Sequence, residues 1–118
     1  MNRTLRLLLA LGLLLGPARA SAHAHFKRSE PAAGSRITSS PQAIRLWFTE
    51  RPELSMTLIS MKDANGKAIA LAPPESDRGD PLMVAARVSQ PLPAGQYTVA
   101  WRTAGSDGHP SRGTFSFV

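Results

Sequence analysis

Three histidines are the side chains best suited to chemistry in this sequence, and all three lie near an end of its predicted mature part. His23 and His25 are one residue apart in "RASAHAHF" (residues 19–26), and His109 lies in "SDGHP" (residues 106–110). The chain has no cysteine, so thiolate metal sites and thiol catalysis are excluded. A metal ion would have to be held by histidine, methionine, carboxylate or backbone groups.

The residues before His23 have the features of a cleaved signal peptide. Arg3 and Arg6 form a basic start, "LLLALGLLLG" is a short apolar core, and "ASA" is a small-residue cleavage site. The apolar core has about half of the roughly 20 residues that a membrane-spanning helix needs. We therefore predict a cleaved segment over residues 1–22 and one exported domain over residues 23–118, not inserted in a membrane.

Cleavage after Ala22 would make His23 the first residue, with a free α-amine beside its imidazole. The α-amine has an ordinary pKa of about 7.7–8.0, so freeing it for a metal at neutral pH costs little. Two nitrogens closing one chelate ring suit a tetragonal Cu(II) site. Signal peptidase tolerates most residues after its cut, so His23 alone does not establish a metal site. His25 is an alternative ligand, because an amine, two backbone amides and a third-position histidine can wrap Cu(II) locally.

Asp107 and His109 flank Gly108 in a turn that Pro110 stiffens. A carboxylate and an imidazole two positions apart could point at one ion, although an ordinary exposed Asp-Gly turn has the same sequence. In an antiparallel sandwich, the first strand and the loop before the last strand can meet at one end. His23, Asp107 and His109 would then supply four ligands, counting the α-amine.

The elements that must position these residues are short strands separated by turn clusters. In "AIRLWF", Ile44, Leu46 and Phe48 share one face and Arg45 lies on the other, which is typical of a half-buried strand. The predicted strands cover residues 23–28, 43–48, 55–61, 68–71, 82–88, 97–103 and 114–118. About seven strands at these intervals predict an all-β fold, a Greek-key sandwich or barrel.

The connections and the large aromatic residues complete this prediction. Asn65-Gly66 predicts a hairpin turn. Residues 72–81, "APPESDRGDP", are predicted to be a loop that cannot pair, because of their prolines and Gly79. The aromatic residues expected in the core are Trp47, Trp101 and Tyr97, the last with its hydroxyl hydrogen-bonded.

Charge gives no support for nucleic-acid binding. Removing the three arginines of residues 1–22 leaves 11 basic and 8 acidic residues, a net charge of +3. These charges are scattered and form no lysine- or arginine-rich run. A monomer is expected.

Three stretches resemble the CopC copper-resistance family over essentially all of residues 23–118. They are "HAHFKRSEPAAGS", "AIRLWFTE" and "PLPAGQYTVAWRTAGSDGHPSRGTFSFV", in that order. The resemblance implies a periplasmic, cupredoxin-like β-barrel that binds Cu(II) through His23, Asp107 and His109. It also implies that Glu50, at the end of "LWFTE", lies near the site and orients an imidazole. A solvated glutamate at a strand end is the alternative for Glu50.

The methionines differ from those of family members that carry a methionine-rich Cu(I) loop. Met56, Met61 and Met83 are dispersed, and no histidine accompanies them. Two of the three alternate within strands as core residues do, where a flexible thioether fills gaps. We therefore predict a protein that binds Cu(II) only.

The predicted function is copper homeostasis or resistance, as a periplasmic chaperone or buffer without enzymatic activity. An inner-membrane copper transporter resembling CopD is a candidate partner. One alternative is an enzyme, because an N-terminal histidine on a β-sandwich also resembles the copper site of lytic polysaccharide monooxygenases. Those sites have three nitrogens, whereas Asp107 would favour Cu(II) over the reduced metal that activates oxygen. A metal-free interaction sandwich is the second alternative.

Overall fold

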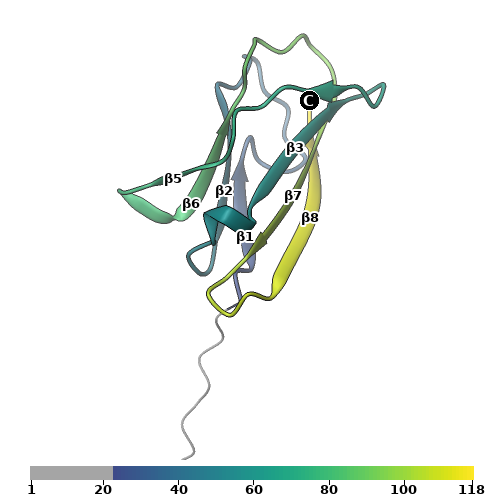
Figure 1. Ribbon diagram of the computed structural model, residues 1–118. Helices are drawn as coiled ribbons and strands as arrows, with labels where there is room; N and C mark the ends of the chain where they lie inside the picture. Colours follow the sequence, from purple (N-terminus) through teal and green to yellow (C-terminus); the bar gives the residue numbers. More distant parts are fainter. Residues whose placement is uncertain (1–22) are drawn as a thin grey trace, which may run out of the picture.

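The computed structural model describes residues 23–118, which form two four-stranded sheets packed face to face (Figure 1). The strands are β1 (Phe26–Glu30), β2 (Ala43–Phe48), β3 (Leu58–Asp63), β4 (Ala68–Ile69), β5 (Glu75–Asp77), β6 (Asp80–Arg87), β7 (Tyr97–Ala104) and β8 (Pro110–Phe117). A short 3-10 helix, η1 (Leu54–Met56), precedes β3. The predicted leader, residues 1–22, lies outside the described residues. Within residues 23–118, no helix has the length and apolar character needed to cross a membrane.

Each sheet is built from two antiparallel pairs of strands that follow one another in the chain. Sheet A has the order β1-β2-β6-β5, and sheet B has the order β4-β3-β7-β8. The chain passes from one sheet to the other after β2, after β4 and after β6, so the two central pairings join segments distant in sequence. This arrangement confirms the predicted all-β sandwich. It has eight strands where the sequence predicted about seven.

The core lies between the sheets and follows the alternation of the strands. Ile44, Leu46 and Phe48 of β2 are fully buried. Trp101 and Tyr97 of β7 face them from sheet B, as predicted. The Tyr97 hydroxyl donates a hydrogen bond of 2.6 Å to the Pro93 carbonyl.

The prediction that Trp47 lies in the core is wrong, because this residue lies on the outer face of sheet A. Its position in β2 gives it the same side as Arg45, so alternation itself takes it out of the core. The indole Nε1 donates to Asp80 at 2.7 Å, and the Arg28 guanidinium lies 3.6 Å from the ring centroid. The partly buried ring is thus held by a polar and a cationic partner.

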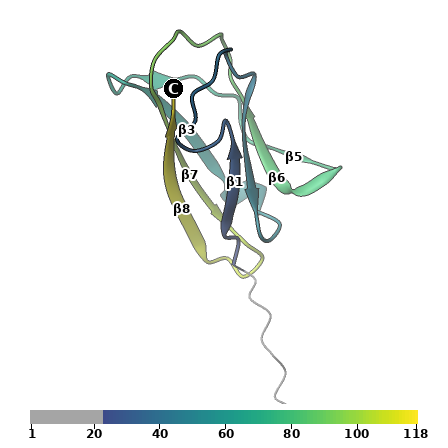
Figure 2. The same cartoon turned by 180° about the vertical axis from the view of Figure 1, so that it is seen from behind.

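The loop predicted over residues 72–81 was also wrong in part. Glu75–Asp77 forms β5, which pairs with β6 at the edge of sheet A and projects from the sandwich (Figures 1 and 2). The register shifts between Ser76 and Asp77, which leaves residues 81–83 without a partner on β5. Pro81, which has no N–H to donate, falls in this unpaired stretch.

Candidate metal centre

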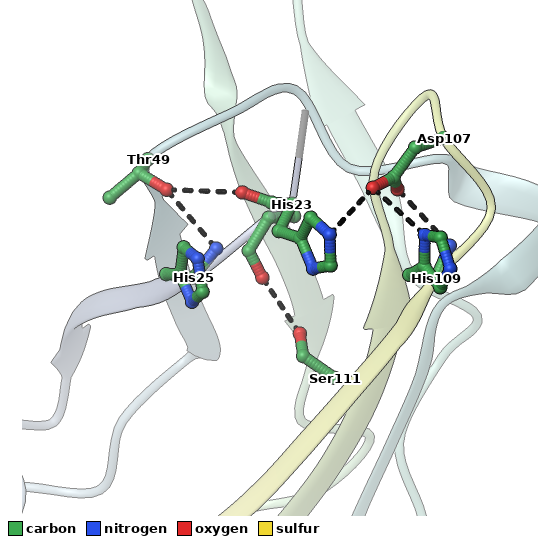
Figure 3. Close-up of polar contacts among 7 residues, drawn as sticks. His23, His25, Thr49, Asp107, His109 and Ser111 are labelled. Atoms are coloured by element: carbon green, nitrogen blue, oxygen red, sulfur yellow. Dashed lines mark hydrogen bonds and ion pairs between the residues drawn. The ribbon is translucent and has the colours of Figure 1, made fainter. Parts of the chain in front are cut away.

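The two histidines and the carboxylate predicted as ligands converge at one end of the sandwich. Asp107 Oδ2 lies 3.0 Å from His23 Nε2 and 3.1 Å from His109 Nδ1 (Figure 3). The two imidazole rings are nearly parallel, with centroids 4.9 Å apart and planes inclined by 5°. One ligand atom from each of the three residues lies within 4.8 Å of the other two. Three groups so placed could hold one metal ion.

The turn between β7 and β8 presents Asp107 and His109 on the same side. Gly108 adopts a φ of +74°, a left-handed conformation that glycine accepts without strain. Its N–H donates to the Gly105 carbonyl at 3.0 Å, which closes the turn. The His109 N–H donates to Asp107 Oδ1 at 3.1 Å, so the second carboxylate oxygen is left between the two rings.

The segment before β1 is fixed by contacts with both sheets. On the sheet A side, the Thr49 N–H donates to the His25 carbonyl at 2.9 Å, and the His25 N–H donates to Thr49 Oγ1 at 3.1 Å. On the sheet B side, the Ser111 hydroxyl donates to the Ala24 carbonyl at 2.7 Å. Ala24 is 1% exposed, and it anchors the segment in the core. These contacts hold His23 opposite the β7–β8 turn.

Thr49 and Ser111 are the positioning residues that sequence reasoning missed. The hydroxyl groups of both residues contact the main chain of residues 23–25. Both residues are more than 20 positions from this segment in the sequence. Serine and threonine occur throughout the chain, so nothing in their local pattern distinguishes these two.

The electrostatics of the cluster depend on the Asp107 carboxyl. Burial raises its pKa, but hydrogen bonds from the backbone and side chain of His109 and the nearby charges of His23 and His109 outweigh that effect. The net result is a pKa below the ordinary value of 3.8. The Asp107 carboxyl is therefore ionised throughout the neutral range.

His25 and Glu50 occupy different places from the three converging groups. The His25 ring lies beyond His23, away from Asp107, with ring centroids 5.9 Å apart and planes inclined by 11° (Figure 3). Glu50 is exposed, and its side chain forms no hydrogen bond or ion pair with another residue of the 23–118 region. The contact with the N-terminal segment at this point is made by its neighbour Thr49.

The methionines lie in three separate environments. Met61 is 2% exposed in the core on β3, and Met83 is 7% exposed on the outer face of sheet A opposite Trp47. Met56 is 41% exposed on η1. Met61 thus packs in the core as predicted, whereas Met83 is buried outside the core cluster.

A small antiparallel β-sandwich with a histidine–carboxylate cluster at one end defines the structural class of this chain. The family model described as the CopC domain matches residues 26–118, and the chain belongs to the CopC family.

Named relatives extend this assignment to most of the chain. Copper resistance protein C of Escherichia coli is 33% identical over 114 residues, which cover 91% of this chain and 90% of the relative. Copper resistance protein C of Pseudomonas syringae pv. tomato is 32% identical over 122 residues, covering 99% and 96%. Protein YobA of Escherichia coli K12 is 32% identical over 96 residues, covering 81% and 77%.

Solved structures share the fold. CopC from Methylosinus trichosporium OB3b superposes with a TM-score of 0.74 at 26% identity, over 80% of this chain and 91% of that one. PcoC, a methionine-rich copper resistance protein from Escherichia coli, gives a TM-score of 0.74 at 30% identity, over 81% and 97%. Family, relatives and structures together support a copper-related resistance role for this chain.

Proposed function

We propose that this chain is a periplasmic Cu(II)-binding protein that buffers or carries copper, with His23, Asp107 and His109 as its ligands. The observation that carries the proposal is the convergence of these three side chains from opposite ends of the chain. Two imidazoles, one carboxylate and the α-amine of a mature His23 make a nitrogen–oxygen set that suits tetragonal Cu(II).

Chelation by the α-amine imposes a condition on the His23 ring. The amine and Nδ1 of one histidine close a six-membered ring with a metal, whereas Nε2 is too far from the amine. In the structure, Nε2 faces Asp107. The chain still includes residue 22, so the His23 nitrogen is part of a peptide bond and is not a free amine. The ring is 48% exposed and therefore has room to turn when the free amine binds.

The contacts of His25 favour a site across the sandwich over a local one. A local chelate would use the deprotonated amide nitrogens of Ala24 and His25 as ligands. The His25 N–H is already bonded to Thr49 Oγ1, and the His25 carbonyl accepts from the Thr49 N–H. Local chelation would break the first bond and disturb the second, whereas the cross-sandwich site leaves both intact.

Binding without catalysis fits the ligand set better than oxygen chemistry. The carboxylate of Asp107 carries a full negative charge at neutral pH, and this charge stabilises Cu(II) over Cu(I). Cu(I) also prefers soft thioether ligands, and the described methionines lie in separate places. A CopD-like inner-membrane transporter is the partner we propose for copper exchange.

Copper titration of two protein preparations tests this proposal. One is released from a fusion so that it begins at His23, and the matched control keeps one methionine before His23. We expect the control to bind Cu(II) more than tenfold more weakly, because its amine is displaced from the imidazole. Equal affinity would show that the α-amine is not a ligand, and no tight binding by either would favour a metal-free interaction domain.

A further inference from the structure

The outer face of sheet B is basic where it approaches the metal cluster. Alternation directs every second residue of its three long strands to solvent. These outward residues are Leu58, Ser60 and Lys62 of β3, Thr98, Ala100 and Arg102 of β7, and Pro110, Arg112, Thr114 and Ser116 of β8. All except the partly buried Ser116 are exposed, three are basic and none is acidic.

Two arginines lie directly opposite each other on this face. Arg102 and Arg112 are cross-strand partners, only two residue pairs from the end of the β7–β8 ladder that carries the metal-site turn. Like charges in this position destabilise a sheet. Within residues 23–118, neither arginine forms an ion pair. The sheet therefore holds two like charges side by side, and no described carboxylate lies within ion-pair distance of either.

The arginines on the strands of sheet A, in contrast, have carboxylate partners. Arg28 and Arg45 both approach the Glu30 carboxylate, at 3.4 and 3.9 Å, and Arg87 approaches Glu75 at 3.2 Å. The facing pair Arg102 and Arg112 therefore differs from these paired strand arginines of sheet A, although Lys27, Arg36, Arg51 and Arg78 also form no ion pair within residues 23–118.

An exposed apolar side chain borders the arginine pair. Leu58 is the cross-strand neighbour of Arg102 and is 65% exposed. We call Leu58, Arg102 and Arg112 the sheet B patch.

We propose that the sheet B patch is a docking surface for another protein that presents carboxylates beside apolar side chains. Such a surface would neutralise both arginines and cover the exposed Leu58 in one contact. Complementary charge also speeds encounter and fixes orientation more than it adds affinity. Figure 1 shows β7 and β8 leading from this face to the turn of the metal site, so a docked partner would lie beside the ligands. Copper exchange with that partner rests on the proposed function, whereas docking itself does not.

A second copy of this chain is a poorer match than an acidic partner, because each mature copy carries a net charge of +3. On sheet A, Glu30 and Glu75 already pair with arginines and Asp80 accepts from the Trp47 indole. Glu50 and Glu53 are exposed, but Arg51 lies between them in the chain. An anionic membrane is the other source of negative charge, and a flat sheet face lacks the amphipathic-helix geometry that inserts among headgroups.

The test uses metal-free protein, so that docking is measured independently of copper binding. The probe is a short soluble peptide of alternating aspartate and leucine, titrated into isotope-labelled protein and followed by amide chemical shifts. We expect shifts centred on the sheet B patch and weaker binding at high salt. Arg102→Ala with Arg112→Ala should weaken binding roughly tenfold, as expected for two exposed ion pairs.

The matched control removes the same charge from sheet A, as Arg45→Ala with Arg87→Ala. It should change peptide affinity by no more than about twofold. An equal loss in both double variants would overturn the proposal, because binding would then follow net charge only. Binding to phosphatidylglycerol vesicles is measured by sedimentation. If the protein binds the vesicles more tightly than the peptide, and this binding depends on Arg102 and Arg112, the proposal is overturned in favour of a lipid surface. Thermal unfolding of each variant verifies that it is folded.

Discussion

Replacing His109 and replacing His25 separates the two models of the copper site. In the cross-sandwich model, His109→Ala removes an imidazole whose Nδ1 lies 3.1 Å from Asp107 Oδ2. His25→Ala removes a ring that stacks beyond His23 and shares no contact with Asp107 in the described structure. In the local model the order inverts, because His25 closes the chelate and His109 is a bystander. Each variant is thus the control for the other.

The magnitude follows from what each variant removes. Loss of a partner behind a metal ligand costs roughly 10–100-fold in affinity, so loss of the ligand itself should exceed 100-fold. His109→Ala also removes the hydrogen bond between the His109 ring and Asp107 Oδ2, so a second candidate ligand loses one of its contacts. For His25→Ala, we expect a change of less than about tenfold, because its main-chain contacts with Thr49 do not depend on the side chain.

Competition against a Cu(II) chelator of known affinity measures both effects, on protein verified by intact mass to begin at His23. Electron paramagnetic resonance supplies an independent readout, because the cross-sandwich site has three nitrogens and one oxygen around copper and the local chelate has four nitrogens. Tight binding that survives His109→Ala but not His25→Ala would refute the cross-sandwich assignment.

Three further predictions follow from the same contacts. Reduction of the copper-loaded protein should release metal to a modest Cu(I) chelator, and retention would show that thioethers converge on the site. Ser111→Ala should lower Cu(II) affinity about tenfold in competition titrations, because the Ala24 carbonyl loses its 2.7 Å donor; unchanged affinity would remove Ser111 from the positioning residues. Gly113→Ala should lower the free energy of unfolding by about 1–3 kcal/mol in denaturant titrations, since its Cβ would lie 2.8 Å from Trp101 Cζ2; Thr114→Ala, exposed on the same strand, is the control.

Much of the fold could be predicted because its information is local. The alternation in "AIRLWF" places Ile44, Leu46 and Phe48 in the core, and Asn65-Gly66 makes the turn between β3 and β4. Strand β5 could not be predicted in this way, since all three of its residues are exposed and show no alternation. Its pairing is decided by the neighbouring β6, a tertiary effect that strand propensity does not contain.

The sequence singled out the three candidate ligands that the structure brings together, but not the residues that position them. Histidine and aspartate are rare enough in this chain for their positions to stand out, and the resemblance to CopC joined the two ends that spacing alone could not. Thr49 and Ser111 differ, because their role depends on which main-chain groups lie opposite them once the two sheets have packed.

This dependence on packing links copper affinity to closure of the sandwich. Thr49 belongs to the sheet A side and Ser111 to β8 of sheet B, and together they hold a three-residue segment that has no ladder of its own. Asp107 and His109 sit on a turn whose internal hydrogen bonds fix their mutual geometry without help from the segment. Changes in the turn should therefore alter the ligands directly, whereas changes in core packing should act on copper binding by moving His23 relative to that turn. A destabilised core variant that unfolds at lower temperature yet keeps full Cu(II) affinity in its folded state would contradict this coupling.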